Sequence, residues 1–407
     1  MKIPVPPESV AIPLAEPLLL GNETAYVLEC LQSNRISTSG PMVTRFEHAL
    51  EERLGARWAV ATVSGTAALH VALLAVGVRP GAEVVMPRIS FVAPANAVRY
   101  CSAWPVFTDI DSAHWQWDLA QVREFLDRGC ERTPSGLRNL RSGRPVGALL
   151  AVHLLGGLCD LDAMFELARE FGLPVVEDAA QACGARYRGR PIGASAGGRV
   201  PSLAIVSFNA NKIVTSGGGG AILTNDPALA RRCRHLTTVA KLAGPGFVHD
   251  EVGFNYRLPS LAAALGLAQL EQLDAFLARK RAIASRYAAL LGPVPSIRFR
   301  VSPEWEEPNH WLCTVLVDGD AAPVVAALQA SGIEARPIWT PLHRLPAFAG
   351  CLCAGAAGGF VDRFYRGALS LPSGCGLSDA CIQTVAGALV RALAPRETAR
   401  GCHGLGR

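Results

Sequence analysis

Short apolar runs alternate with amphipathic helical stretches through most of the first 255 residues, and this alternation limits the possible fold more than any other feature. The runs that predict strands are 58–65, 83–91, 105–111, 146–156, 173–182, 202–208 and 220–226. Helical patterns such as 66–78 and 160–172 lie between several of them. Strands separated by helices of about ten to fifteen residues indicate βαβ units. We therefore predict an α/β fold with a large, mainly parallel sheet.

The pattern changes after about residue 255. Residues 258–291 predict one long amphipathic helix, with a bend left open, that would link two lobes. Further strand and helix patterns follow at 311–320, 323–339 and 379–393. We expect a large α/β domain with an N-terminal arm over 1–255, a linking helix and small α+β domain over 256–394, and a disordered tail over 395–407. Within the large domain, the polar, turn-rich segment 128–145 predicts a surface loop.

The composition is typical of a globular protein and argues against two classes of partner. Half of the 407 residues are apolar and 18% are charged, as in chains with a large core. The formal net charge is +5 without a block of like charges, so we expect no nucleic-acid surface. No run of about 18 uncharged apolar residues occurs, so we expect no membrane span.

The N-terminal segment and the cysteines predict a cytoplasmic protein. Residues 1–21 are proline-rich and are interrupted by Glu8 and Glu16, unlike the continuous apolar core of a signal peptide. Twelve cysteines are scattered singly, with no C-x-x-C pair. This spacing predicts reduced thiols used as small buried hydrophobes, and no metal site.

Polar residues follow two of the predicted strands, where ligands of such sheets bind. Ser64, Gly65 and Thr66 join a strand to a helix, and free backbone N–H groups at a helix start suit a phosphate. An ordinary helix N-cap is the alternative explanation. Asp178 closes another strand, where its carboxylate could pair with a ring nitrogen, act as a helix cap or form a salt bridge.

A single lysine, Lys212, stands before four consecutive glycines in the stretch SFNANKIVTSGGGG. A lysine in a desolvated pocket has a lowered pKa and can react with a carbonyl compound. The glycines do not form a dinucleotide loop, because G-x-G-x-x-G would require glycine where Ile222 stands. The motif G-x-x-x-x-G-K-[ST] is also missing from the sequence.

Together these elements suit pyridoxal phosphate. This cofactor needs a lysine for its aldehyde, an anion cradle for its phosphate, a carboxylate for its pyridine nitrogen and a flat group over its ring. The chain supplies these groups in order: Ser64-Gly65-Thr66, Phe91, Asp178, and then Ser207 and Lys212. Their joint occurrence is more specific than any one of them.

The sequence resembles the DegT-type (StrS-like) family of sugar aminotransferases, which are fold-type I pyridoxal-phosphate enzymes. The resemblance covers most of the chain. It is carried by SGTAALHVAL, VVMPRISFVAPANAV, FTDID, HLLGGLCDLDA, VVEDAAQACGA, SFNANK, GGAILTND and GFNYRLPSLAAALGLAQLE.

The resemblance implies a role for each matching residue. Lys212 would bind the cofactor aldehyde covalently and move a proton, and Asp178 would pair with the pyridine nitrogen. Gln181 would lie near the ring hydroxyl, and Phe91 would stack on the ring. The residues implied at the phosphate are Gly65, Thr66, Ala67 and Ser207, with Asn255 reaching the phosphate of a neighbouring subunit. That last role implies a homodimer with shared active sites.

The resemblance extends to one branch of the family. The stretches FNANKIVTSGGGG, NYRLP and RPIWTPLH are similar to enzymes that aminate UDP-linked 4-keto-6-deoxy sugars with an acetamido group, with glutamate or glutamine as amino donor. Thr340 departs from that pattern, which often has lysine there. The expected substrate contacts are Arg336, Trp339, His343 and His310, with packing or surface roles as the alternative.

Three other activities fit the same fold. The chain could aminate a keto-cyclitol of an aminoglycoside-type pathway, and the sequence separates this poorly from a sugar aminotransferase of surface-glycan or natural-product biosynthesis. Deoxysugar dehydratases of this type replace the lysine with histidine, so Lys212 argues against them. A cofactor-binding regulator would normally carry an added nucleic-acid-binding segment, and the sequence shows no basic module.

Overall fold

The computed structural model describes residues 12–195, 200–355 and 358–394. The expected disordered tail over 395–407 and the first eleven residues of the expected N-terminal arm lie outside these ranges. The α-helices are α1 Glu23–Gln32, α2 Pro41–Leu54, α3 Gly65–Ala75, α4 Ala93–Tyr100, α5 Leu119–Arg128, α6 Leu161–Phe171, α7 Pro227–Thr237, α8 Ser260–Glu271, α9 Leu273–Leu291, α10 Ala321–Ala330, α11 Phe360–Gly367 and α12 Asp379–Leu393.

Short 3₁₀ helices and seventeen strands complete the described elements. The 3₁₀ helices are η1 Leu154–Gly156, η2 Ile192–Ser195, η3 Leu342–Arg344 and η4 Pro346–Phe348. The strands are β1 Trp58–Thr62, β2 Glu83–Pro87, β3 Trp104–Thr108, β4 Cys130–Thr133, β5 Gly136–Asn139, β6 Val146–Val152, β7 Val175–Asp178, β8 Arg186–Tyr187, β9 Arg190–Pro191, β10 Ser202–Ser207, β11 Gly220–Thr224, β12 Ile297–Arg298, β13 Glu306–Glu307, β14 Cys313–Val317, β15 Arg336–Pro337, β16 Leu352–Cys353 and β17 Ala368–Leu371.

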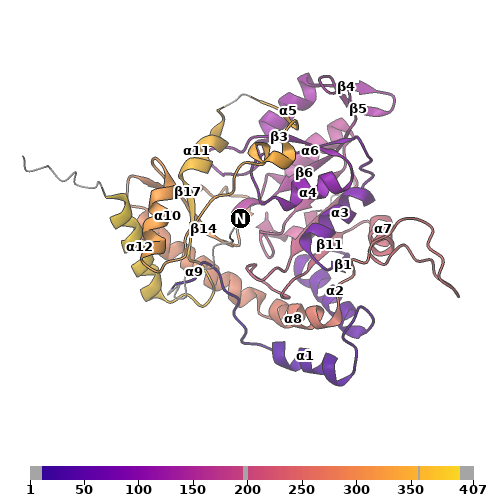
Figure 1. Ribbon diagram of the computed structural model, residues 1–407, viewed down its shortest axis with the longest axis horizontal. Helices are drawn as coiled ribbons and strands as arrows, with labels where there is room; N and C mark the ends of the chain where they lie inside the picture. The colour runs from indigo at the N-terminus through magenta and orange to yellow at the C-terminus, as the bar shows by residue number, and fades with distance from the viewer. Residues whose placement is uncertain (1–11, 196–199, 356–357, 395–407) are drawn as a thin grey trace, which may run out of the picture.

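An eight-stranded sheet forms the centre of the molecule, in the order β1-β11-β10-β7-β6-β2-β3-β16 (Figure 1). Only β11 runs antiparallel to its neighbours, and the remaining pairs are parallel. The predicted α/β fold with a mainly parallel sheet is therefore confirmed. Because β1 and β10 are both antiparallel to β11, the carboxyl ends of β1, β10, β7 and β2 meet at one edge of the sheet.

The sheet is apolar on both faces, and successive side chains enter two separate cores. Ala59 and Ala61 of β1 belong to a core with α2, α5, α6 and α8, whereas Val60 belongs to a core with α3, α4 and α7. Val175 and Val176 of β7 divide in the same way. A strand covered on both faces shows a continuous apolar run, which explains the runs that predicted these strands.

The linking segment forms two helices instead of one. Helices α8 and α9 meet at Gln272 with a bend of 60°. Helix α9 leads to a four-stranded sheet in the order β12-β14-β17-β15, with α10 and α12 beside it (Figure 1). The division of the chain near residue 255 stays a prediction. One later segment, β16, pairs with β3 at the edge of the large sheet.

The prediction of a surface loop over 128–145 is wrong for much of that segment. Cys130–Thr133 and Gly136–Asn139 pair as an antiparallel hairpin, β4–β5. The side chain of Asn139 is buried and donates to Glu83 at 2.7 Å. The hairpin was not predicted because the segment is rich in polar and turn residues, and its few buried side chains do not form an apolar run.

Two further sequence predictions concern membrane spans and the state of the cysteines. Among the described residues no single helix is long and apolar enough to cross a membrane; α8 and α9 together reach that length but are bent apart. The eleven cysteines within the described ranges are all free thiols, seven of them buried.

Candidate active site

A cavity of about 490 Å³ lies at the sheet edge where the carboxyl ends of β1, β7 and β10 meet. Its walls also include residues of the later part of the chain, near β14 and β15. The lining residues are Ser64, Gly65, Thr66, Leu69, Phe91, Ala93, Pro94, Asp178, Ala180, Gln181, Ser207, Asn209, Asn211, Lys212, Gly218, Gly219, Trp311, Arg336 and Trp339. Nine of the thirteen residues predicted from the sequence are among them.

The start of α3 presents free backbone donors to this cavity. Ser64 caps the helix, and its Oγ accepts from the Ala67 amide at 3.0 Å. The amides of Gly65 and Thr66 have no acceptor among the described residues. The helix-cap explanation of the SGT motif is therefore confirmed, and the next two amides remain available to an anion, so the phosphate site stays a prediction. The Ala67 amide serves the cap, and Ala67 does not line the cavity.

Glycine is required where this helix start packs against the neighbouring strands. A Cβ on Gly65 would lie 3.0 Å from the Cβ of Ser207. A Cβ on Gly220 would lie 2.6 Å from the Gly65 nitrogen. Gly217 has a φ of 76°, which favours glycine, whereas a Cβ on Gly218 would meet no atom within 4 Å. The glycine run thus lets β11 pack against the start of α3, where the free amides of Gly65 and Thr66 lie. It also turns the chain after Lys212.

Lys212 follows β10 and reaches into the cavity. Its backbone N–H donates to Asn209 O at 2.9 Å in the turn after the strand. Burial lowers the pKa of the Lys212 ammonium to about 8, although the carboxylate of Asp178 favours the charged form. A large share of the amino group is therefore neutral near pH 8, as a nucleophilic amine requires.

Asp178 ends β7 and is buried beneath the cavity, with 4% of its surface exposed. Burial raises the pKa of this carboxyl, while the Ala180 N–H, which donates to Oδ1 at 3.0 Å, and the nearby Lys212 and His153 lower it. No salt bridge within 4 Å joins Asp178 to any described residue. A buried carboxylate at the cavity floor without an ion-pair partner is suited to a cationic ring nitrogen.

Phe91 and Gln181 both line the wall of this cavity. Phe91 is 55% exposed, which is unusual for a phenylalanine and leaves its ring available for stacking. The Gln181 Oε1 accepts from the Leu155 N–H at 2.8 Å, so its amide nitrogen remains available to a ligand.

Two tryptophans and one arginine from the later part of the chain complete the cavity. Arg336 and Trp339 were expected as substrate contacts; Arg336 is exposed and pairs with Glu334 at 2.6 Å. Trp311 was not predicted. Its ring lies over the amino group of Lys212, 3.8 Å from the ring centroid to Nζ. The segment PNHWLC has no local pattern that distinguishes this tryptophan from one that only packs in the core.

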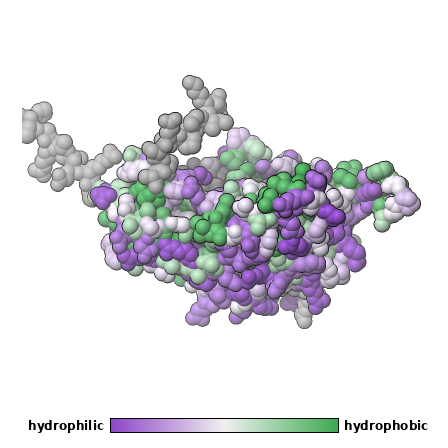
Figure 2. All heavy atoms as spheres, turned by 90° about the horizontal axis from the view of Figure 1, so that it is seen from below, coloured by the Kyte–Doolittle hydropathy of each residue, from purple (hydrophilic) through white to green (hydrophobic). Residues whose placement is uncertain are grey.

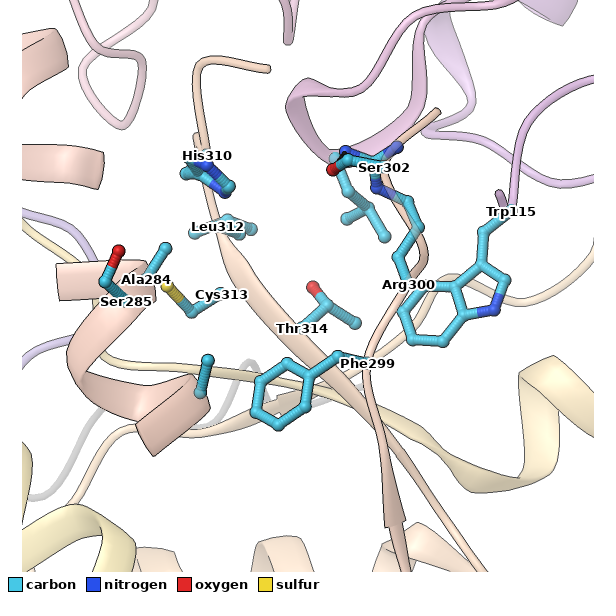
Figure 3. Close-up of a pocket in the computed structure, with 12 residues that line it drawn as sticks. Trp115, Ala284, Ser285, Phe299, Arg300, Ser302, His310, Leu312, Cys313 and Thr314 are labelled. Carbon is cyan, nitrogen blue, oxygen red and sulfur yellow. Dashed lines mark hydrogen bonds between the residues drawn. The ribbon is translucent and has the colours of Figure 1, made fainter. Parts of the chain in front are cut away.

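Three predicted residues lie away from the cavity of Lys212. Asn255 is exposed and pairs with Thr238 at the base of an arm formed by residues 238–252. His343 is half-buried in η3, and its Nδ1 has no hydrogen-bond partner among the described residues. His310 lines a second cavity of about 230 Å³, drawn in Figure 3, together with Trp115 and Arg300. Burial and nearby cations lower the pKa of His310 to about 4.

The sequence profile of one protein family matches residues 19–390. The chain belongs to the DegT/DnrJ/EryC1/StrS aminotransferase family. The predicted family membership is thereby confirmed, and the cavity around Lys212 is the candidate active site of this family member.

Curated relatives of this family member carry names of aminotransferases and amino-sugar synthases. It is 37% identical over 370 residues to the pyridoxal phosphate-dependent aminotransferase EpsN of Bacillus subtilis (strain 168), covering 90% of this chain and 92% of that protein. It is also 37% identical over 399 residues to the GDP-perosamine synthase of Caulobacter vibrioides, covering 94% and 98% respectively.

Two solved structures share the fold. The aminotransferase TlmJ from Streptoalloteichus hindustanus has a TM-score of 0.83 and 31% identity, covering 94% of this chain and 99% of that one. DesV from S. venezuelae has a TM-score of 0.80 and 34% identity, covering 92% and 95%. The likeness therefore includes both the large sheet and the four-stranded sheet of this DegT-type protein.

Proposed function

We propose that this aminotransferase moves an amino group from glutamate or glutamine to a nucleotide-linked keto sugar, with pyridoxal phosphate as cofactor. The observation that carries the proposal is the cavity that gathers Lys212, Asp178 and the free amides of Gly65 and Thr66. Family membership supports transfer of an amino group, and the names of EpsN and the perosamine synthases support the cofactor and the sugar.

The residues present fit the proposed cofactor. Gly65 and Gly220 let the start of α3, with its unpaired amides, pack closely against β10 and β11 beside the cavity. Asp178 is a buried carboxylate without an ion-pair partner among the described residues, and Phe91 exposes its ring to the same cavity. Pyridoxal phosphate, when bound, would supply an electron-withdrawing ring that stabilises negative charge on the substrate carbon.

The chain's own groups would then hold the cofactor and move a proton. The Gly65 and Thr66 amides and the Ser207 hydroxyl would bind the phosphate, and the α3 start would favour its negative charge. Asp178 would keep a pyridine nitrogen protonated, and Phe91 would cover one face of the ring. Lys212, about half neutral near pH 8, would accept a proton at Nζ from the substrate carbon and return it.

For the substrate we propose a UDP-linked 4-keto-6-deoxy sugar with an acetamido group, as the stretches FNANKIVTSGGGG and RPIWTPLH suggest. The similarity to GDP-perosamine synthases favours a GDP-linked keto sugar as the second candidate. Arg336 and Trp339 at the cavity mouth are the proposed contacts for either substrate.

We also propose a homodimer in which Asn255 serves the partner's active site. Asn255 is exposed and does not line the cavity of its own chain. A second copy placed against this surface would give the residue a ligand to bind.

Incubation with glutamate and a panel of UDP-, GDP- and TDP-linked keto sugars, read by mass spectrometry, tests the function. We expect an amino-sugar product with one nucleotide class. Lys212→Ala should keep the fold, by circular dichroism, and lose more than about a thousandfold in rate. Arg128→Ala, which removes an exposed cation from α5, is the control and should retain activity. Unchanged amino transfer by Lys212→Ala would refute the role of Lys212.

A further inference from the structure

Trp311 places the face of its indole ring over the amino group of Lys212. The distance from Nζ to the ring centroid is 3.8 Å, and Trp311 is only 3% exposed. An ammonium group this close to a tryptophan face, with water largely excluded, is attracted by the ring quadrupole. The contact joins residues 99 positions apart, because Lys212 follows β10 and Trp311 immediately precedes the small-sheet strand β14.

The indole ring is fixed on two further sides. Its Nε1–H donates to the Asn211 carbonyl at 2.7 Å, next to the lysine that it covers. The ring of Trp339 lies nearby in a nearly parallel plane, with ring centroids 6.4 Å apart and planes inclined by 11°. The ring therefore has little freedom to tilt away from Lys212.

The backbone of Trp311 is held by two buried side chains that no step described so far uses. Its N–H donates to Asn309 Oδ1 at 2.9 Å, and its carbonyl accepts from Lys280 Nζ at 2.8 Å. Asn309 is 1% exposed, and its Nδ2 also donates to Gln181 O at 3.0 Å and Cys183 O at 2.9 Å.

Lys280 lies in α9, with 3% of its surface exposed, and donates to the Trp311 and Ser373 carbonyls. No carboxylate within 4 Å pairs with Lys280 in the described part of the chain. Burying a lysine costs desolvation energy, and hydrogen bonds to the two carbonyls offset part of that cost. Here Lys280 fixes the residue whose ring covers Lys212.

We propose that Trp311 is a positioning residue for Lys212: its ring face holds the side-chain amino group over one spot in the cavity, and Asn309 and Lys280 hold the ring. This inference rests on the proposed function, in which Lys212 is the reactive amine. A lysine that must leave a ligand and return to it gains from a fixed resting place, because its long side chain otherwise samples many rotamers. The ring face also favours the protonated amine and so opposes the effect of burial.

The sequence makes this contact directly measurable, because it contains four lysines: Lys2, Lys212, Lys241 and Lys280. Cofactor-free protein labelled with ¹³C-lysine gives one Cε signal for each of them, and the pH dependence of the Lys212 signal reports its protonation. Lys212→Met and Lys280→Met assign the signals of Lys212 and Lys280.

Two variants separate the ring face from simple covering. Trp311→Phe and Trp311→Met open the cavity to water to a similar extent, since their side chains are close in size, and only phenylalanine presents a ring. We expect the Lys212 midpoint to lie about half a unit higher in Trp311→Phe than in Trp311→Met. We also expect a broader Lys212 signal in the wild type than in Trp311→Met, because a side chain restrained by the ring loses the fast internal motion that narrows its signal.

Equal midpoints in the two variants, with both folded by circular dichroism, would overturn the proposal. An unchanged Lys212 linewidth in Trp311→Met would do the same for the positioning role. Because neither measurement involves cofactor or substrate, failure of this inference is distinguishable from failure of the proposed amino transfer, which the Lys212→Ala assay addresses.

Discussion

At the scale of single residues, Lys212 and Asp178 act on each other across the cavity. Burial disfavours the charged form of both groups, and each charge favours the other. The effect on Lys212 leaves its pKa at about 8, well below the usual 10.5 of lysine. The lowered pKa therefore gives Lys212 a reactive amine fraction near neutral pH without a neighbouring base.

The pH dependence of Lys212 labelling checks this balance. With cofactor-free protein, the rate of trinitrophenylation of the Lys212 peptide should rise with pH and reach half its maximum near pH 8, because the neutral amine reacts. Asp178→Asn removes the charge that favours the ammonium form, so the midpoint should fall by about one unit. Asp274→Asn, an exposed acid in α9, is the control and should not move it. A midpoint that stays above pH 10 in wild-type protein would contradict the prediction.

Residues adjacent to strand ends were predictable, and residues brought in by the second lobe were not. The strand ends at Ser64, Asp178 and Ser207 are visible as polar breaks after apolar runs, and the sheet topology then forces them together. Trp311 lies next to Lys212 only because the four-stranded sheet packs beside the large one. No periodic pattern or spacing encodes that contact, which spans about a quarter of the chain.

At the scale of elements, the glycine run determines how closely β11 approaches α3. Gly220 pairs with Thr62 of β1 and with Ser207 of β10, so it sits between two strands whose ends form the cradle. The Ser64–Gly65 turn occupies the space where a side chain of residue 220 would lie. The sequence excluded a dinucleotide loop here, but only the structure shows the packing reason for the glycines.

Gly220→Ala should destabilise the protein and should also disturb the start of α3, where the proposed phosphate site lies. The new methyl group would meet the Gly65 nitrogen, so we expect the free energy of unfolding to fall by about 2 kcal/mol. Gly218→Ala, two residues earlier, meets no atom within 4 Å and should change stability by no more than about 0.5 kcal/mol. Urea unfolding of both variants gives the comparison. Equal stability of the two would show that the close approach is not rigid.

At the scale of the whole molecule, the segment after α7 extends from the body as an arm over 238–252 (Figure 1). Its apolar side chains are exposed: Phe247 is 86%, Val252 82% and Val248 57% exposed. Figure 2 shows hydrophobic surface at the end of the molecule where this arm lies. Exposed apolar side chains on a protruding arm favour burial against another chain, which supports the proposed homodimer.

Charges introduced on the arm should dissociate such a dimer. Phe247→Asp combined with Val252→Asp would place two carboxylates in the proposed interface, so we expect the mass by light scattering to fall from dimer to monomer. Val301→Asp alters a valine that is 58% exposed elsewhere on the surface, and this control should stay dimeric. A double variant that remains dimeric would exclude the arm from the interface.

The pairing of β16 with β3 affects the order in which the protein can be completed during synthesis. The outer edge of the large sheet is covered by Leu352 and Cys353, and the cavity around Lys212 is closed by Trp311, Arg336 and Trp339. A nascent chain that has emerged only as far as residue 300 has every other strand of that sheet, yet it exposes the β3 edge and an open cavity. Ribosome-bound intermediates are therefore expected to be sensitive to protease and unable to retain cofactor until nearly seven-eighths of the chain has left the exit tunnel.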